Sequence, residues 1–449
     1  MTVSRLPWLL LFVASDALAG GYFFPDSGVV ATGRGGAFIA SADDTFAQYY
    51  NPGALSRLDR WTIDLGVSGV QQSLSFDRMM DDGTFAGTVS NEGGMFVVPQ
   101  IGVGGPLIED KLHMAVGLYT GYAPSFAYEE EGPQRYTLQD SLIWQAFAGP
   151  SVSYSPIPQL SIGVGLQWQF LRVEQQLTVS TTGGDNPGSD VDVSVKQSDP
   201  FAPSANFGLL IKPVDALSIG LTLQLPSSFD ANGSMTADFR GSAIEDLLVE
   251  TQIQDDSVRL GLNMPLIVKA GVAVHPSDDA VIELAMVYEQ WSSLTELALS
   301  EIDLEVTFEN PDFPAPEVER TLSLPAGLRD VVSLRLGGSV DVIDELTLRA
   351  GGFYETGSQR DDQLNVGLYD PAKFQLSGGT SVHLLDDRLH IDLSVANIFF
   401  ASRDVRDSTV EQVVLQQGDN FVPSVVGNGD YRSNGFVLAG GVSWSFGKG

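Results

Sequence analysis

Hydrophobic and polar residues alternate with period two through most of the chain after residue 60. From Leu160 to Trp168 every second residue is apolar, and Ser, Gly and Gln occupy the positions between. The stretch 217–224 repeats this pattern. Because successive side chains of a β-strand point to opposite faces, the pattern predicts strands with one apolar face and one small, polar face. Such strands fit a soluble sandwich with an apolar core or a membrane barrel with an apolar lipid face, and alternation alone leaves both open.

The lengths of the connections favour the barrel. Seven alternating strands have their first apolar residue at Trp61, Leu112, Leu160, Leu217, Ala280, Leu346 and Leu389, and each start after the first follows a short turn. Long polar connections lie between these turns, near 77–94, 123–139, 180–201, 225–250, 308–330, 356–372 and 402–431. Short periplasmic turns that alternate with long extracellular loops are typical of bacterial outer-membrane barrels. We therefore expect an all-β transmembrane barrel of fourteen antiparallel strands over residues 61–446.

The last strand supports a bacterial outer-membrane location. Its apolar face ends in Trp444 and Phe446, and only three residues follow. An aromatic-ended final strand looks like the signal that barrel-assembly machinery recognises, so this machinery is an expected partner. We expect Trp61 and Trp444 at the periplasmic interface, where aromatic belts form.

The first sixty residues do not alternate. Arg5, an apolar run over 6–14 and the sequence Ala17-Leu18-Ala19 predict a signal peptide at 1–19, and a buried N-terminal helix is the alternative. Residues 20–60 are rich in Gly and Ala and have helical spacing from Ala31 to Tyr50. This segment could lie in the periplasm or inside the barrel. Its small residues and near absence of Lys favour a plug inside the lumen.

Composition excludes several classes of protein. The chain has 57 acidic and 24 basic residues, a net charge of −33, and a nucleic-acid binder needs the opposite surface. The lack of Cys excludes a disulfide scaffold, a Cys-ligated metal and a thiol nucleophile. The length of 449 residues would allow two or three soluble domains. The patterning instead predicts a signal peptide, a plug and one barrel, whose strands explain the 48 Gly and the charged fraction of only 18%.

A set of short motifs resembles the FadL-type outer-membrane transporters of long-chain fatty acids and aromatic hydrocarbons. The motifs are Gly33-Arg34-Gly35-Gly36-Ala37, Ala42-Asp43-Asp44, Asn51-Pro52-Gly53-Ala54-Leu55, and the stretches 262–265, 271–273, 288–292 and 346–352. They cover essentially the whole mature chain. The Asn-Pro-Ala of the family is Asn-Pro-Gly-Ala in this chain.

The resemblance implies a fourteen-stranded barrel plugged by an N-terminal hatch, residues 20–60, with Gly33, Arg34, Gly35, Gly36, Asn51 and Pro52 as its motif residues. It implies that a hydrophobic compound is captured by extracellular loops, enters a lumenal pocket and leaves sideways through a gap at a kinked third strand. The N-terminal residues Tyr22, Phe23 and Phe24 would line the pocket. The third strand should run over 112–122, with Gly117 and Gly121 as candidates for the kink and ordinary barrel glycines as the favoured alternative.

The resemblance also implies passive uptake by a monomer embedded in outer-membrane lipid and lipopolysaccharide. The third long loop, which includes Ser180 and Asp185, is polar and acidic where the fatty-acid branch has an apolar groove. A fatty acid and an aromatic hydrocarbon therefore both stay open as substrates. A non-selective diffusion porin and a structural or adhesive barrel are the alternative functions.

Polar clusters give no strong sign of catalysis, metal or cofactor. All four His residues fall in or beside short turns, on the periplasmic side, so we expect no outer-leaflet hydrolase. His383 and His390 flank one turn symmetrically and should be cross-strand neighbours, either as a metal pair or, as we favour, as polar residues at a wet lumen end. Asp185, Asp190 and Asp192 could bind calcium but lack EF-hand spacing, so a solvated acidic loop is favoured. The sequence thus predicts no metal and no cofactor.

Overall fold

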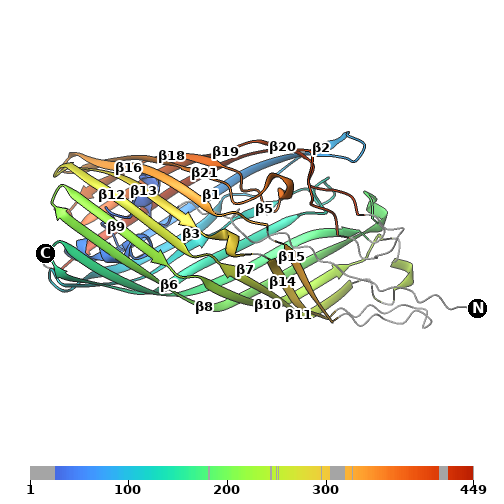
Figure 1. The fold of residues 1–449 in the computed structure, drawn as a ribbon, viewed down its shortest axis with the longest axis horizontal. Coiled ribbons are helices and arrows are strands. Elements are labelled where there is room, and N and C mark those ends of the chain that lie inside the picture. Colours follow the sequence, from blue (N-terminus) through green and yellow to red (C-terminus); the bar gives the residue numbers. More distant parts are fainter. Residues whose placement is uncertain are drawn as a thin grey trace, which may run out of the picture.

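The computed structural model of the protein describes residues 26–180, 183–242, 245–248, 250, 252–294, 296–303, 319–325, 327–413 and 423–447. Fourteen of its strands form a closed antiparallel barrel, in which each strand pairs with its neighbours in the list and the last pairs with the first (Figure 1). The prediction of a fourteen-stranded barrel is confirmed. Its strands are β1 (Trp61–Met79), β3 (Phe96–Ile108), β4 (Leu112–Tyr122), β6 (Asp140–Ile157), β7 (Leu160–Ser180), β8 (Asp190–Val214), β9 (Leu217–Gln224), β12 (Ile267–Ser277), β13 (Ala280–Glu289), β16 (Val331–Ile343), β17 (Leu346–Glu355), β18 (Lys373–Leu384), β19 (Leu389–Phe400) and β21 (Gly429–Phe446).

Shorter elements extend the barrel at the end opposite the C-terminus (Figure 1). The strands there are β2 (Phe85–Ser90), β5 (Ser125–Ala127), β10 (Ser227–Asp238), β11 (Gln252–Met264), β14 (Glu296–Asp303), β15 (Glu319–Pro325) and β20 (Arg403–Val405). The 3-10 turns are η2 (Pro187–Ser189), η3 (Glu245–Leu247), η4 (Trp291–Ser293) and η5 (Asp361–Gln363). None of the helices in the described residues is long and apolar enough to cross a membrane.

All seven strand starts predicted from the sequence are observed. The first residues of β1, β4, β7, β9, β13, β17 and β19 are the seven apolar positions that follow the acidic or Pro-containing turns. Each short turn joins two strands that are hydrogen-bonded to each other. For example, the ladder between β6 and β7 ends at the pair Ile157 and Leu160, on either side of their turn. The end of the barrel that carries these turns is therefore the periplasmic end.

The polarity of both faces of β7 inverts near Phe170. Below this point the outward side chains Leu166 and Trp168 are 59% and 54% exposed, while Gln167 is buried. Above it Leu171 is buried and Arg172 points outward, with about half of its side chain exposed. An apolar outer face needs lipid and a polar outer face needs water, so the hydrocarbon layer ends near Phe170. Beyond it the barrel continues into the extracellular space.

The described part of the hatch lies inside the periplasmic half of the lumen. It contains α1 (Val29–Gly33), α2 (Ala47–Tyr50) and η1 (Pro52–Arg57), which Figure 1 shows in dark blue near the end marked C. Helix α1 packs on β18 and β19, and η1 packs on β6, β7 and β8. The wall has glycines where the hatch comes closest: Gly163 and Gly208 meet Pro52, and Gly351 meets the carbonyl of Arg34. Much of the excess Gly thus makes room for the hatch.

Candidate functional site

An apolar cluster fills the lumen on the extracellular side of the hatch. We call it the lumenal apolar cluster. It comprises Leu74, Phe76, Val89, Phe126, Tyr128, Leu138, Ile143, Leu171, Val173, Leu177, Val179, Val191, Val193, Val195, Ala202, Phe229, Ala231, Met235, Ala237, Phe239, Leu248, Val258, Leu260, Leu262, Trp291, Leu294, Leu328, Val331, Leu364, Val366, Leu368, Tyr369, Val405, Val413 and Tyr431. Much of it comes from the inner faces of β7, β8, β10 and β11, and other strands and the connections between them supply the rest. The inward-facing side chains of the strands are therefore polar around the hatch and apolar on its extracellular side.

The floor of this apolar region is charged. Asp26, at the start of the described chain, pairs with Arg335 of β16. The carboxylate of Glu289 accepts a hydrogen bond of 2.7 Å from the indole of Trp291. The ammonium of Lys269 donates to the carbonyl of Tyr49 at 3.0 Å, stands 3.7 Å from the centroid of that ring, and forms no ion pair with a described carboxylate. These groups surround a cavity of about 20 Å³ between hatch and wall, at Gly36 and Tyr122. Charges buried at membrane depth mark candidate functional positions.

The barrel wall is interrupted between β3 and β4. Their ladder begins at the periplasmic turn and ends at the pair Ile101 and Leu118, although β3 continues to Phe96 and β4 to Tyr122. On the other side of β4, the register with β6 shifts between Thr120 and Tyr122, so Gly121 is an inserted residue. Apolar side chains cover the interruption, where Val98 and Ala123 pack together. An extra residue bends the strand that carries it, which explains why β4 leaves β3 here.

The beginning of the hatch lies against this interruption. The hydroxyl of Ser27 donates a hydrogen bond of 2.7 Å to the carbonyl of Thr120. The amide of Gly28 donates at 2.6 Å to Oε1 of Gln100, which is the first residue of β3 beyond the last ladder pair. Backbone groups that lose a ladder partner must be paired in another way, and the hatch pairs one of them. The N-terminal residues Tyr22, Phe23 and Phe24 lie outside the described residues, as does the predicted signal peptide.

The two glycines predicted as kink candidates have different surroundings. A side chain at Gly117 would collide with the amide of Gln48 in α2, so this glycine gives space to the hatch. Gly121 is the residue at the register shift, and a side chain there would collide with the ring of Phe147. Sequence reasoning could not separate the two, because both are lumen-facing glycines of one strand.

The glycines of the hatch motif permit close contact with the wall. Gly35 and Gly36 have φ of 62° and 71°, a region that other residues rarely adopt. Gly35 lies against the backbone of Gly352, and Gly33 lies against Gly379. The guanidinium of Arg34 donates to Ser339 of the wall at 2.8 Å. The motif is therefore a docking segment for β16 to β18.

Asn51 and Pro52 end α2 and begin η1. The side-chain amide of Asn51 donates to the carbonyls of Ile39, in the hatch, and Leu209, in the wall, at 2.9 and 3.0 Å. Its side-chain oxygen accepts from the amide of Gly53 at 3.0 Å. Residue 53 contributes only its backbone amide to this hydrogen bond. Gly can therefore take the position that Ala has in the family.

Two wall carboxylates that sequence reasoning did not single out hold the hatch in place. Glu283 of β13 accepts hydrogen bonds from the amides of Ile39, Ala40 and Ser41 at 2.6, 3.0 and 2.8 Å. Asp64 of β1 accepts from the amide of Thr45 at 2.9 Å. One feature of the sequence does point to these two carboxylates: each is an isolated acidic residue at a lumen-facing position of an alternating strand. Such a buried charge needs a specific partner.

Asp185 and Asp190 are largely buried in ion pairs, whereas Asp192 is exposed. Asp185 pairs with both Arg78 and Arg135, and Asp190 pairs with Arg135 at 2.8 Å. Asp192 accepts hydrogen bonds from Thr178 and Gln139 at 2.9 and 3.1 Å. The favoured interpretation of a solvated acidic loop is therefore wrong for Asp185 and Asp190, because arginines far away in the sequence neutralise both carboxylates.

His383 and His390 are direct cross-strand neighbours in β18 and β19, as predicted. Asp387 of the intervening turn lies beside both rings.

Comparisons with known proteins agree with this architecture. Residues 10–446 match the family model of "Outer membrane protein transport protein (OMPP1/FadL/TodX)". No curated protein matches the sequence. Among solved structures, a FadL homologue of Pseudomonas aeruginosa is similar, with 17% identity, a TM-score of 0.78, and coverage of 95% of this chain and 100% of the other. The toluene transporter TodX of Pseudomonas putida has 14% identity, a TM-score of 0.67, and coverage of 95% and 100%. The toluene transporter TbuX of Ralstonia pickettii has 14% identity, a TM-score of 0.67, and coverage of 94% and 99%.

Proposed function

Since the chain belongs to the OMPP1/FadL/TodX family of outer-membrane transport proteins, we propose that it takes up hydrophobic compounds, either long-chain fatty acids or aromatic hydrocarbons. Transport is passive, follows the plugged barrel to a lateral exit, and involves no catalysis. The structurally similar P. putida and R. pickettii proteins are toluene transporters, which fits this substrate class.

The observation that carries the proposal is the interrupted ladder between β3 and β4, next to an apolar lumen. A solute in the lumenal apolar cluster is already out of water, and each Å² of apolar surface returned to water costs about 25 cal/mol. A sideways exit past Val98 and Ala123 leads to hydrocarbon, whereas the route straight down meets the hatch and its buried charges. The lateral route therefore avoids this cost.

We assign residues 1–19 to the signal peptide, 20–60 to the hatch and 61–446 to the barrel. Tyr22, Phe23 and Phe24 are the proposed substrate contacts. Asp26 to Gly28 lie at the interruption, and the Cα of Phe24 is two residues, or at most about 7 Å, from that of Asp26. Aromatic rings at this place would bury acyl or arene surface.

The remaining partners follow from the surface. The band of exposed apolar side chains that includes Leu166, Leu284 and Leu376 would contact outer-membrane lipid and lipopolysaccharide. On β21 the residues Phe436, Leu438, Val442, Trp444 and Phe446 face outward together, which suits recognition of this strand by barrel-assembly machinery. We propose that the barrel works as a monomer.

The test uses the signal-peptide-processed protein, purified and analysed by native mass spectrometry for a bound acyl or aromatic compound. Cells that lack the gene should take up labelled fatty acid or toluene more slowly, and the intact gene should restore uptake. A variant that lacks residues 20–25 should bind the ligand more weakly while its barrel stays folded. Unchanged uptake in the deletion strain, together with a large, steady conductance in planar bilayers, would instead establish a non-selective porin.

A further inference from the structure

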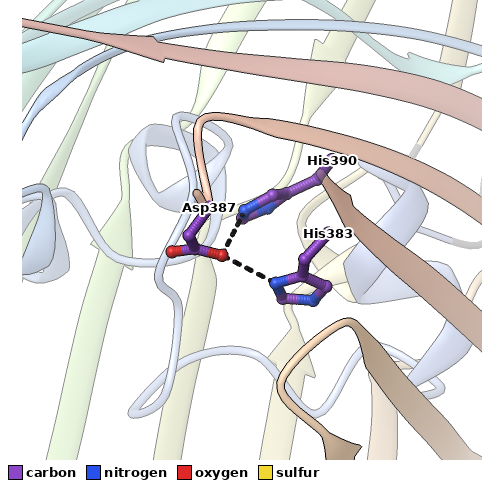
Figure 2. A group of neighbouring side chains, drawn as sticks. All are labelled: His383, Asp387 and His390. Carbon is purple, nitrogen blue, oxygen red and sulfur yellow. Dashed lines mark hydrogen bonds and ion pairs between the residues drawn. The ribbon is translucent and has the colours of Figure 1, made fainter. Parts of the chain in front are cut away.

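Three side chains converge at the periplasmic mouth of the barrel. Figure 2 shows His383 of β18, His390 of β19 and Asp387 of the turn between them. Oδ1 of Asp387 lies 2.7 Å from Nδ1 of His383 and 2.9 Å from Nε2 of His390, and the two ring centroids are 4.3 Å apart. One carboxylate oxygen thus faces one nitrogen from each imidazole, and the three ligand atoms, one from each residue, lie within 4.8 Å of one another.

The turn holds Asp387 in this position with an unusual backbone. Leu385, Asp386 and Asp387 have φ of 56°, 54° and 62°, so three consecutive residues other than Gly are in the left-handed region. This conformation costs roughly 1–2 kcal/mol per residue. Among the described non-glycine residues of the other periplasmic turns, Asp110 alone has a φ in this region. Strain of this kind is kept where the surroundings require a particular geometry.

A second chain of hydrogen bonds orients His383. Its Nε2 lies 2.8 Å from the hydroxyl of Thr347, and that hydroxyl donates to Asp341 at 2.5 Å. Because the hydroxyl proton is committed to Asp341, its oxygen accepts the proton on Nε2. The neutral imidazole then has its free lone pair on Nδ1, the atom that faces Asp387. A ligating His usually donates its other ring N–H to an outer acceptor that fixes the tautomer, and Thr347, held in turn by Asp341, has this place.

We propose that His383, Asp387 and His390 bind a divalent transition-metal ion, of which Zn²⁺ is representative, through two imidazole nitrogens and one carboxylate oxygen. This goes beyond the sequence-based expectation, which considered only the two His residues and favoured no metal. At metal–ligand distances of about 2.0–2.1 Å, tetrahedral ligands are about 3.3 Å apart. Asp387 therefore moves outward by roughly half an ångström on binding. Its side chain is 63% exposed and free to do so, and water supplies the fourth ligand.

The surroundings favour a cation. The three residues lie on the wall of a cavity of about 430 Å³ at the periplasmic mouth, whose described lining contains nine Asp and four Arg residues. A cleft lined mainly by one sign of charge raises the local concentration of counter-ions. The ion would join the ends of β18 and β19, the two strands on which α1 rests through Gly33 and Ser394. The site is thus separate from the proposed ligand route and connected to the hatch.

The test is calorimetric titration of ZnCl₂ into the untagged, processed protein after treatment with a chelator, at neutral pH. We expect one equivalent bound by the wild type and by His113→Gln/His275→Gln, which removes the other two His residues. The variant His383→Gln/His390→Gln should bind no Zn²⁺ at this site, and Asp387→Asn should bind it more weakly. Thr347→Val keeps all three ligands and should weaken binding about tenfold or more.

Folding of each variant is checked by its mobility on gels without heating, since a closed barrel migrates differently from the unfolded chain. With Co²⁺ in place of Zn²⁺, the wild type should give the visible absorption of a tetrahedral ion, and the double His variant should not. The proposal is overturned if the folded wild type binds no Zn²⁺. It is equally overturned if His383→Gln/His390→Gln binds one equivalent as tightly as the wild type does.

Discussion

The hydroxyl of Ser27 donates a hydrogen bond to the carbonyl of Thr120, 93 residues along the chain, at the point where β4 separates from β3. The same short segment that begins the described hatch therefore touches the broken edge of the wall. If substrate leaves there, movement of β4 relative to β3 must be possible.

Joining the two edges covalently should stop transport. The protein has no Cys, so Val98→Cys/Ala123→Cys introduces the sole thiol pair, at two side chains that pack together across the interruption. We expect oxidation to reduce uptake of the hydrophobic substrate at least tenfold and a reductant to restore it. Uptake is measured with labelled substrate in whole cells.

The control is Leu223→Cys/Val268→Cys, which joins the paired strands β9 and β12, where the ladder is intact. Its oxidation should leave uptake unchanged. Equal uptake by both oxidised variants, with the disulfides verified by mass spectrometry, would exclude the lateral route.

A methyl group at Gly35 should prevent the hatch from docking. Gly35 has φ of 62°, and an added Cβ would meet the backbone of Gly352. Gly83 has φ of 82° but open space around it, so Gly83→Ala isolates the backbone cost of about 1–2 kcal/mol. We expect Gly35→Ala to expose the hatch to protease in the folded barrel and Gly83→Ala to leave it protected. Protection of the hatch in both variants would contradict the docking role.

Loss of the charge on Glu283 should loosen the hatch. A carboxylate that accepts hydrogen bonds from three backbone amides is replaced in Glu283→Gln by a group with one acceptor oxygen and an NH₂ that faces the same donors. We expect a cost of about 3 kcal/mol to hatch docking. The measurement is ion conductance in planar bilayers, which should rise, whereas the turn variant Asp215→Asn should conduct as the wild type does. A closed Glu283→Gln barrel would show that other contacts suffice.

Lys269 should separate the two substrate classes. Its ammonium lies below the lumenal apolar cluster and forms no ion pair with a described carboxylate, so it can receive the carboxylate of a fatty acid. Lys269→Met keeps the length of the side chain and removes the charge. We expect fatty-acid binding to weaken at least tenfold and arene binding to change little, as measured by fluorescence displacement. If both ligand classes bind as before, the ammonium has no part in recognition.

Arg135 should hold the extracellular loops together in a pH-dependent way. It pairs with Asp185 and Asp190, and all three side chains are less than a fifth exposed. Removing one partner of a buried ion pair costs about 3–5 kcal/mol, so Arg135→Met should make these loops much more sensitive to protease. Arg240→Met, which removes an exposed pair with Asp238, should change little.

The sign of the pH effect follows from Asp190. Burial raises the pKa of Asp190, although the guanidinium of Arg135 opposes the shift. A raised pKa in the folded state means that the contribution of this group to stability is complete below its unfolded pKa of about 3.9 and is lost as pH rises through the folded pKa. Without Arg135 the pKa of Asp190 is raised further, so more stability is lost as the pH rises. The increase in protease sensitivity caused by Arg135→Met should therefore be greater at pH 7 than at pH 4. A greater increase at pH 4 would contradict this account.

The repeating part of the fold could be predicted from local sequence. Strand starts such as Leu160 and Leu389 follow short turns, and the alternation on each strand is set by lipid on one side. The sequence predicts the third strand over 112–122, and β4 lies there. These features depend on residues close together in the chain, which a sequence displays directly.

The site depended on pairings between distant residues, and these could not be predicted. Arg78 of β1 and Arg135 of another loop both pair with Asp185, so the acidic loop is part of a network of ion pairs. The position of Asp387 beside His383 and His390 requires three left-handed residues in a row, which the sequence does not predict. The role of Gly121 depended on the register between β4 and β6.

The inversion of polarity at Phe170 sets the height of the entrance above the membrane. Leu160 to Trp168 covers eight residue steps, or about 26 Å along the strand and about 20 Å across the membrane at a tilt of about 40°. The ten steps from Phe170 to Ser180 raise the rim by about 25 Å more. The barrel therefore stands well into the hydrated sugar layer of the outer leaflet. An apolar molecule that enters at the rim crosses that layer behind a wall whose inner face is dry.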